Sequence, residues 1–234
     1  MGQVLYTLIG SGRMAKHTAS YFKNLHIPFL QWSRSQSKEE LVNFVQESTH
    51  ALLLIKDSTI ENFLDENPCL DNKIKIHFSG ALLTQKAWSA HPLYSFPEQE
   101  IESRNYQKIP FIIEEEGPEF DTLLPCLPNP HFRIPREKKP YYHALCVLGD
   151  NFTTLLWQKF FRSMENEFKI PEEYLKGYLE QNFLKLNRDV STALTGPFVR
   201  RDRETLEKDL FAMKNDECFQ IFSSFIETYL KEKI

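Results

Sequence analysis

The sequence predicts an α/β domain with a mostly parallel sheet, followed by a second domain that is entirely helical. Between residue 4 and about residue 134, short apolar segments typical of buried strands alternate with segments of helical periodicity. From about Pro140 onward the strand signals stop and only helical periodicity remains. We therefore expect a first domain over residues 1–137 and a second over residues 138–234.

The elements of the first domain follow from local patterns. Strands are expected at residues 4–9, 27–32, 51–55, 73–78, 87–90, 111–114 and 130–134, and helices at 14–24, 38–47, 57–63 and 120–127. The helix over 38–47 turns Leu41, Phe44 and Val45 to one face. Asp57 stands where an N-cap is expected. Prolines around the strand at 130–134 place it at the edge of the sheet.

The second domain has four expected helices, at residues 142–164, 172–188, 203–213 and 216–230. Ile170-Pro171 and Thr195-Gly196-Pro197 interrupt the helical pattern. Large apolar side chains cover most of the circumference of the first of these helices, so it must be buried on several sides. We expect part of that burial to come from a second copy of the chain in a homodimer.

Composition excludes several classes of protein. The chain has 234 residues, a formal net charge of −4 and 41% hydrophobic residues. This charge gives no general field for nucleic acid, and no apolar run is long enough to span a membrane. The four cysteines have neither metal-ligand spacing nor the pattern of a disulfide framework, so no metal is expected. These features predict a cytoplasmic protein that acts on a small molecule.

A glycine motif joins the first strand to the first helix. The apolar segment ending at Ile9 runs directly into Gly-x-Gly-x-x-Ala, of which the residues expected to contact a dinucleotide are Gly10, Ser11, Gly12, Arg13 and Met14. The first glycine allows a tight turn, the second lets the backbone approach a pyrophosphate, and the helix N-terminus points toward the phosphates. The alternative is a glycine turn that serves only packing. The context of strand, motif and helix favours a Rossmann-like nucleotide site.

The end of the second strand indicates which nucleotide binds. NAD-specific Rossmann domains place an acidic residue there to bind the ribose 2′-hydroxyl. This chain has none and instead carries Ser33, Arg34 and Ser35, which suit a 2′-phosphate. We therefore predict NADP (NADPH) as the cofactor. The alternative is a solvated loop in which Arg34 has no role.

Polar residues follow several strands at their carboxyl ends, where ligands of open α/β sheets bind. Lys56 and Asp57 follow the third strand and are assigned to cofactor binding, although Asp57 is also a candidate helix cap. Ser79 is assigned to catalysis, because a hydroxyl beside a glycine leaves room for a ligand. Gly80 and His91 are assigned to substrate binding, with a loop histidine as the alternative for His91.

Three residues of the helical domain complete the predicted site. His143 is the expected proton donor or acceptor, because histidine titrates near neutral pH. Asn151 would orient the substrate, and Arg200 would hold a substrate carboxylate. Each has a structural alternative: His143 as a link between helix and sheet, Asn151 as a backbone partner, and Arg200 as part of a solvated basic face.

Five short segments together resemble one family, the bacterial Rossmann-like proteins with a C-terminal helical domain of unknown function, relatives of ketopantoate reductase and pyrroline-5-carboxylate reductase. They are Ile9–Met14, His77–Ala81, His91–Phe96, Tyr142–Ala144 with Asn151, and Ala193–Pro197 through Arg200 and Asp202. The resemblance implies a nicotinamide-binding domain joined to a helical substrate or dimerisation domain. It is incomplete at two positions: Arg201 stands where the family usually has glycine, and Val147 stands where related hydroxyacid dehydrogenases have a catalytic lysine.

These observations lead to two hypotheses of different class. The first is an NADP-dependent oxidoreductase that moves hydride between nicotinamide and a small carbonyl or imine, such as a keto or imino acid. The second is a non-catalytic NADP-binding module with a regulatory or interaction role, which the missing lysine supports.

Overall fold

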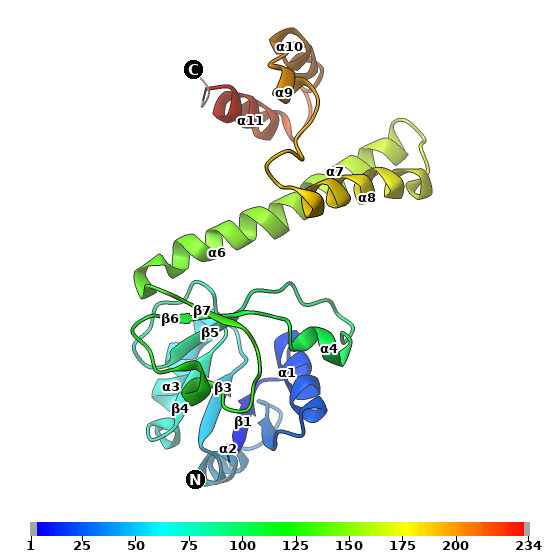
Figure 1. Cartoon of the computed structure of the whole chain (residues 1–234). Coiled ribbons are helices and arrows are strands. Elements are labelled where there is room, and N and C mark those ends of the chain that lie inside the picture. The colour runs from blue at the N-terminus through cyan, green and yellow to red at the C-terminus, as the bar shows by residue number, and fades with distance from the viewer. Residues whose placement is uncertain (1–3, 232–234) are drawn as a thin grey trace. The chain divides into compact units, whose positions relative to one another are not determined.

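Seven short strands form one sheet in the computed structural model, which describes residues 4–231 (Figure 1). They are β1 (Tyr6–Ile9), β2 (Phe29–Trp32), β3 (His50–Leu53), β4 (Ile74–His77), β5 (Trp88–Pro92), β6 (Phe111–Glu114) and β7 (His131–Ile134). The strand order is β2-β1-β3-β4-β5-β6-β7, and only the β5–β6 pair is antiparallel. The mostly parallel Rossmann-like sheet is therefore confirmed, as is the edge position of the last strand.

The second and third strands of the chain lie on opposite sides of β1 in the sheet. From β1 the chain crosses outward to β2 and then returns past β1 to β3. Two hydrogen bonds tie the loops after these strands together: Gly10 N–H donates to Trp32 O (2.8 Å), and Leu54 N–H donates to Ile9 O (2.8 Å). The carboxyl ends of β1, β2 and β3 thus meet at a topological switch point, where sheets of this type bind ligands.

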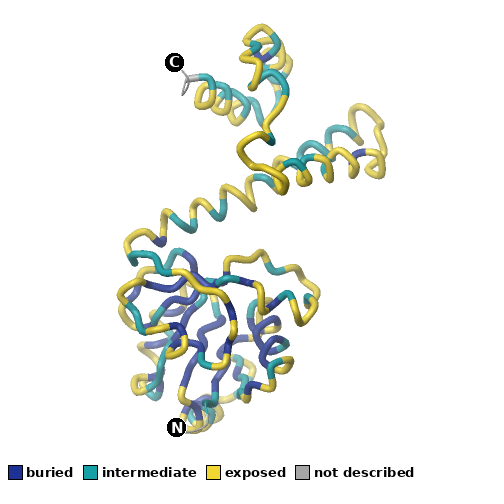
Figure 2. The backbone as a smooth tube through the Cα atoms, viewed as in Figure 1, coloured by how far each residue is buried: buried dark blue, intermediate teal, exposed yellow. Residues whose placement is uncertain are grey.

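Helices cover both faces of the sheet. α1 (Arg13–Asn24), α4 (Ser103–Tyr106) and α5 (Phe120–Leu123) pack on one face, against a core that includes Tyr6, Leu8 and Ile76. α2 (Lys38–Glu47) and α3 (Ile60–Glu66) pack on the other, against Ile9 and Leu53. Figure 2 shows the strands as the buried centre of this part of the chain. Burial on both faces explains why the strands read as continuous apolar segments.

Local sequence accounts for the helix boundaries in most cases. α2 begins and ends where predicted, because Ser37 and Glu40 form a capping box in which each side chain accepts a hydrogen bond from the other's backbone N–H. The predicted capping role of Asp57 is wrong. A short 3₁₀ turn, η1 (Asp57–Thr59), precedes α3, and the Asp57 carboxylate instead accepts a hydrogen bond from Ser79, which is distant in sequence.

Only helices follow Ile134 in the described part of the chain, as predicted. They are α6 (Lys139–Val147), α7 (Thr153–Asn166), α8 (Glu172–Arg188), α9 (Pro197–Arg200), α10 (Arg203–Ala212) and α11 (Phe219–Lys231), with short 3₁₀ turns elsewhere. The helix expected over 142–164 differs in one respect: a π-helical turn, η4 (Leu148–Phe152), separates α6 from α7. A π turn winds fewer degrees per residue than an α turn, so residues before and after η4 are not related by the spacing of a continuous α-helix.

The chain divides into two compact units, residues 1–155 and 156–234, so α6 belongs to the same unit as the sheet. The predicted boundary between functional domains at 137/138 stays a prediction. Within the second unit, Trp157 and Phe160 of α7 pack against Tyr178 of α8, with ring centroids 6.1 and 5.5 Å apart. Lys159 Nζ lies 2.7 Å from the Asp216 carboxylate and ties α7 to the segment before α11. Within residues 4–231, no helix combines the length and apolar character needed to cross a membrane.

Candidate functional site

A pocket of about 200 Å³ lies at the carboxyl edge of the sheet. The segments following β1, β3, β4 and β5 supply its walls, which are formed by Met14, Leu53, Leu54, Ile55, Asp57, Phe78, Ser79, His91, Pro92, Tyr94 and Phe96. Most of these side chains are apolar. The polar exceptions are an aspartate, a serine, a histidine and a tyrosine, so the pocket has the composition of a small-molecule site.

The glycine turn lies next to this pocket and has the geometry that its sequence predicts. Gly10 has φ +135°, and a Cβ atom there would lie 2.3 Å from Leu54 O, so only glycine fits. Gly12 is the N-cap of α1, and a Cβ atom there would meet nothing within 4 Å. The first backbone N–H groups of α1 have no acceptor within the helix, and the space beside Gly12 is open. This arrangement can accept a phosphate group.

The segment after β2 lies beside the glycine turn, because Trp32 O accepts the hydrogen bond from Gly10. It forms a tight turn in which Gln36 N–H donates to Ser33 O (2.9 Å) and Ser33 N–H donates to the Gln36 side chain (3.0 Å). The hydroxyls of Ser33 and Ser35 lie 2.8 Å apart, and the Arg34 side chain is exposed. Two hydroxyls and a guanidinium are thus available to an anion.

Ser79 and Asp57 form a polar pair at the pocket wall. Ser79 Oγ donates a short hydrogen bond to Asp57 Oδ2 and accepts bonds from Leu82 N–H (2.9 Å) and Ala81 N–H (3.3 Å). Ser79 is buried, whereas Asp57 is exposed. The serine hydroxyl therefore has its one proton and both acceptor positions engaged.

Two histidines flank Gly80. A Cβ atom on Gly80 would lie 2.5 Å from His143 Cδ2 and 3.1 Å from His91 Nε2, so glycine is needed for both rings to approach. His91 Nδ1 is hydrogen bonded to the Tyr142 hydroxyl at 2.8 Å, and the two imidazole rings meet edge to face with centroids 6.0 Å apart. Burial, together with the nearby His143, lowers the pKa of His91 to about 4. His91 is therefore neutral at physiological pH.

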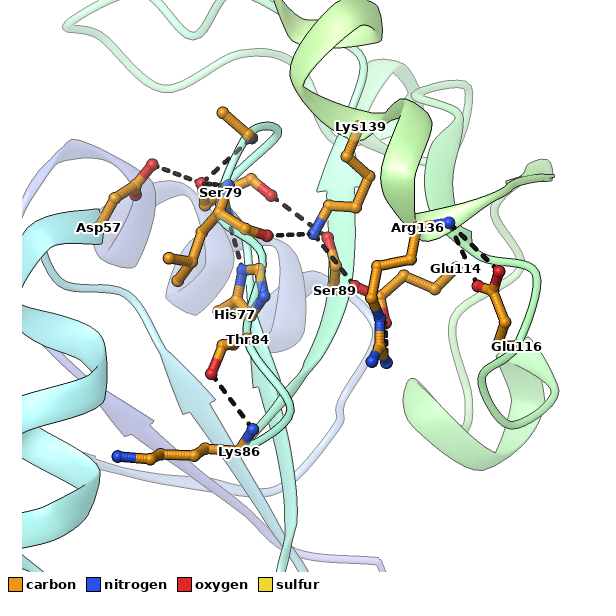
Figure 3. A network of polar contacts seen from close by, with 12 residues as sticks. Asp57, His77, Ser79, Thr84, Lys86, Ser89, Glu114, Glu116, Arg136 and Lys139 are labelled. Carbon is orange, nitrogen blue, oxygen red and sulfur yellow. Dashed lines mark hydrogen bonds and ion pairs between the residues drawn. The ribbon is translucent and has the colours of Figure 1, made fainter.

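A buried ion network lies next to the Ser79 turn (Figure 3). Lys139 Nζ, at the start of α6, donates to Leu82 O (2.7 Å) and to Glu114 Oε1 (3.1 Å), and Arg136 binds the other oxygen of Glu114 at 2.7 Å. Burial lowers the pKa of Lys139, while Glu114 acts in the opposite direction. Because Leu82 also donates to Ser79, this network joins α6 to the Ser79–Asp57 pair.

His77 lies beneath the same turn and is fully buried. Its Nδ1 accepts a hydrogen bond from Ser79 N–H (3.3 Å), and its Nε2 has no hydrogen-bond partner among the described residues. Burial, together with the nearby cations Lys139 and Arg136, lowers the pKa of His77 to about 3. The ring therefore stays neutral and holds the backbone of Ser79 in place.

The structure brings together several of the residues predicted from the sequence. Met14, Asp57, Ser79 and His91 line the pocket, and Gly80 and His143 adjoin it. The glycine turn and the segment over 33–35 lie along the same edge of the sheet, and Arg13 donates to Phe96 O at 3.4 Å.

Three predicted residues are placed differently. Lys56 is exposed, and its carbonyl group, rather than its side chain, accepts hydrogen bonds from Thr59. Asn151 is exposed on the π turn. Arg200 belongs to the second unit, where its guanidinium lies 3.9 Å from the Asp202 carboxylate. The functional roles assigned to these residues stay predictions.

Sequence reasoning missed Tyr142, Lys139 and Glu114 as parts of this site. Lys139 stands in a run of charged residues that resembles a solvated surface, although its side chain is 3% exposed. Glu114 offered a weak signal, since it ends an otherwise apolar strand. A carboxylate at that position needs a buried cation, but the sequence does not show which one.

Comparison with known proteins identifies a family and a set of related folds. Residues 109–227 match a family described as a domain of unknown function (DUF2520). No curated protein sequence matches the chain significantly.

Solved structures share the fold over nearly the whole chain. A candidate NADP oxidoreductase from Bacteroides fragilis superposes with a TM-score of 0.74 at 18% identity, covering 97% of this chain and 98% of that chain. An imine reductase from Streptomyces aurantiacus superposes with a TM-score of 0.67 at 11% identity, covering 97% of this chain and 93% of that chain. A reductive aminase from Aspergillus terreus in complex with NADPH and ethyl levulinate superposes with a TM-score of 0.64 at 14% identity, covering 99% of this chain and 95% of that chain.

Proposed function

For this chain, which belongs to the DUF2520 family, we propose the function of an NADP-dependent oxidoreductase that transfers hydride between nicotinamide and a small carbonyl or imine substrate. The observation that carries this proposal is the glycine turn at the switch point of the sheet, next to a pocket that contains Asp57, Ser79 and His91. Solved structures of the same fold include proteins named as an NADP oxidoreductase and imine reductases.

The residues around the turn fit a dinucleotide. Gly12 leaves open space at the N-terminus of α1, so a pyrophosphate can approach the backbone N–H groups there. Gly10, wedged against Leu54 O, keeps the turn close to the sheet. Ser11, Arg13 and Met14 complete the wall that faces the nucleotide.

The segment after β2 favours NADP over NAD. Between Trp32 and Lys38 the chain has no acidic residue that could bind a ribose 2′-hydroxyl, and it offers Ser33, Arg34 and Ser35 to a 2′-phosphate. Arg34→Ala is therefore expected to weaken NADPH binding roughly tenfold, with little effect on NADH. Arg104→Ala, which removes another exposed arginine, is the matched control.

The pocket residues have separate tasks in this proposal. A bound dihydronicotinamide supplies the hydride, and the chain binds and orients the group that receives it. Gly80 allows His91 and His143 to approach closely, so either ring can adjoin a substrate. Ser79 holds Asp57 in place, because its hydroxyl is fully engaged. Asn151 and Arg200 remain candidates for orienting and binding the substrate.

A non-catalytic NADP-binding module is the second candidate. Two observations favour it: Val147 stands where related hydroxyacid dehydrogenases carry a lysine, and Ser79 has no free proton to donate. Substitution of His143 and Asn151 separates the two functions. An enzyme loses turnover with NADPH affinity unchanged, whereas a module shows no turnover over a broad panel of carbonyls and imines.

The nucleotide proposal is tested by thermal-shift titration with NADPH, NADP, NADH and NAD after removal of bound ligand. We expect stabilisation by the phosphorylated pair. Gly12→Glu should abolish it, because the carboxylate occupies the phosphate position. Gly177→Glu is the matched control, since a Cβ atom at Gly177 also meets nothing within 4 Å. Lack of any shift with all four nucleotides would contradict the proposal.

We also propose that the chain forms a homodimer through its second unit. The α8 side chains Phe183 and Leu184 are 50% and 57% exposed, and such apolar surfaces are typical of subunit interfaces. Light scattering coupled to size exclusion should give the mass of two chains. Replacing both side chains with serine should give the mass of one, whereas a wild-type monomer would contradict the proposal.

A further inference from the structure

The pocket at the carboxyl edge contains one formal charge, and it is negative. Among the residues that line it, Asp57 has the one acidic side chain, there is no lysine or arginine, and His91 is neutral. Cations also lie near the pocket, and the exposed Lys56 adjoins Asp57 in the sequence. Arg13 donates to Phe96 O at 3.4 Å, and Lys139 is buried and paired with Glu114 at 3.1 Å. Neither lysine nor arginine is among the residues that line the pocket.

The hydrogen bonds around Asp57 fix the position of this charge. Ser79 Oγ donates to Asp57 Oδ2, and two backbone N–H groups hold the same hydroxyl oxygen from the other side (Figure 3). Leu82, which supplies one of these N–H groups, is in turn held through its carbonyl group by Lys139. The carboxylate is thus fixed on the side of Ser79 and exposed to solvent on the other.

The same contacts limit proton donation. The Ser79 hydroxyl proton is engaged in the hydrogen bond to Asp57, and the Asp57 carboxylate itself is a hydrogen-bond acceptor, so neither side chain offers a proton to a substrate. Reduction of a ketone needs both a hydride for carbon and a proton for oxygen, and the growing negative charge on that oxygen would face Asp57. Reduction of an iminium cation needs only the hydride, and the positive nitrogen would be attracted to Asp57.

We propose that the substrate is an iminium cation whose nitrogen lies against the Asp57 carboxylate. This inference rests on the proposed oxidoreductase function and narrows its substrate class. The iminium carbon accepts the hydride from the dihydronicotinamide, and the π electrons of the C=N bond become the lone pair on nitrogen. The products are a neutral amine and the oxidised cofactor, so atoms, charge and electrons balance without a proton donor.

A matched pair of substrates tests this assignment. N-methyl dihydroisoquinolinium is a permanent cation, and α-tetralone is a neutral ketone with a similar fused ring. With NADPH in excess, the wild-type chain should oxidise NADPH with the iminium at least about 100-fold faster, in kcat/KM, than with the ketone. Equal or better reduction of the ketone would overturn the inference. Turnover of neither by protein saturated with NADPH would overturn it as well.

Asp57→Asn isolates the charge, because it keeps the shape of the side chain. We expect kcat/KM for the iminium to fall by roughly 100-fold while the affinity for NADPH is unchanged. Added salt should raise the KM of the wild type for the iminium, but not that of the variant. Asp71→Asn, at an exposed aspartate 3.9 Å from Lys75, is the control and should match the wild type. Loss of NADPH affinity with iminium preference retained would mean that Asp57 binds the cofactor instead.

A binding measurement separates the inference from turnover. The protonated amine product, N-methyl tetrahydroisoquinolinium, should bind the wild type at least tenfold more tightly than Asp57→Asn by calorimetry. Equal binding to both would overturn the assignment of Asp57. Failure of the wild type to bind NADPH would instead overturn the proposed function, and the inference with it, so the two failures are distinguishable.

Discussion

The two compact units of this chain differ in where they keep their large apolar side chains. In the first unit, Tyr6, Phe22 and Leu8 are at most 1% exposed and lie between helices and sheet. In the second unit, the buried apolar residues within 156–231 are Leu175 and Leu206, and large side chains such as Phe211 remain exposed.

This difference shows which unit determines its own structure. The first unit encloses a hydrophobic core, and its site residues come from segments that this core fixes. The second unit keeps much of its apolar surface outside any core formed by its own helices, so its helices gain less from burial. Equivalent substitutions should therefore cost more free energy of unfolding in the first unit than in the second.

The largest effect is expected at the buried ion network of the first unit. Lys139→Met removes the cation from Glu114 and the donor from Leu82 O, while Glu114 itself stays 1% exposed. A buried charge that loses one partner typically costs about 3–5 kcal/mol, here reduced by the remaining bond from Arg136. Urea unfolding monitored by circular dichroism measures the loss.

Lys159→Met in the second unit provides the comparison. Lys159 pairs with Asp216 at 2.7 Å, but both side chains are partly exposed, so water replaces the lost contact. The loss of stability should be much smaller than for Lys139→Met. Equal losses would mean that burial does not distinguish the two units.

The next largest loss of stability is expected on substitution of a glycine with positive φ, and the described part of each unit contains one such glycine. Gly10→Ala combines a strained φ of +135° with a Cβ atom 2.3 Å from Leu54 O, and we expect a loss of about 3 kcal/mol. Gly196→Ala in the second unit has φ +81° and no atom within 4 Å of the added Cβ, so only the strain remains, at about 1 kcal/mol. Thermal unfolding of both variants tests the difference, and a larger loss at Gly196 would contradict it.

Acid should destabilise the first unit through its buried histidines. Burial lowers the folded-state pKa of His91 to about 4, below the unfolded value of about 6.5. The unfolded state therefore binds the proton first, and stability falls as the pH drops below about 6.5, until the folded state is also protonated near pH 4. Each pH unit in this range lowers the free energy of unfolding by about 1.4 kcal/mol per histidine, and the His91 contribution reaches about 2 kcal/mol by pH 5.

His91→Gln is the variant that tests this pH dependence. Between pH 6.5 and pH 5, the free energy of unfolding of this variant should fall by about 2 kcal/mol less than that of the wild type. His77, with a pKa lowered to about 3, keeps its own contribution in this variant. His26→Gln, at an exposed histidine, is the matched control. An unaltered profile in His91→Gln would contradict the assignment of a lowered pKa to His91.

The fold could be predicted from the sequence because its signals are local. The apolar segment before Gly10, the glycine spacing and the helical periodicity over 38–47 are each local, and each forms the expected element. Asp57 shows the limit of this reasoning. A side chain before a helix can cap it, yet here a hydroxyl from a different strand end competes successfully for the carboxylate.

The site could be predicted only in part, because it depends on contacts between distant segments. Ser79 and Gly80 follow β4, and His91 lies near the carboxyl end of β5, so the rule for parallel sheets places them together. Tyr142 and Lys139 reach the same place from a helix, 51 residues from His91 and 25 residues from Glu114. Nothing in the local sequence distinguishes Lys139 from its exposed neighbours, since its burial is a property of the assembled fold.

The smallest predicted effect is a gain of stability in the second unit. Arg201 ends α9 in the left-handed conformation with φ +53°. A side chain in this conformation costs free energy that glycine does not, so Arg201→Gly should stabilise the chain by up to about 1 kcal/mol, partly offset by the greater freedom of glycine in the unfolded state. Glu180→Gly, at an exposed position inside α8, should destabilise it by about 1 kcal/mol instead. Thermal unfolding measures both, and a loss of stability in Arg201→Gly would mean that the Arg201 side chain makes a contact worth more than the strain.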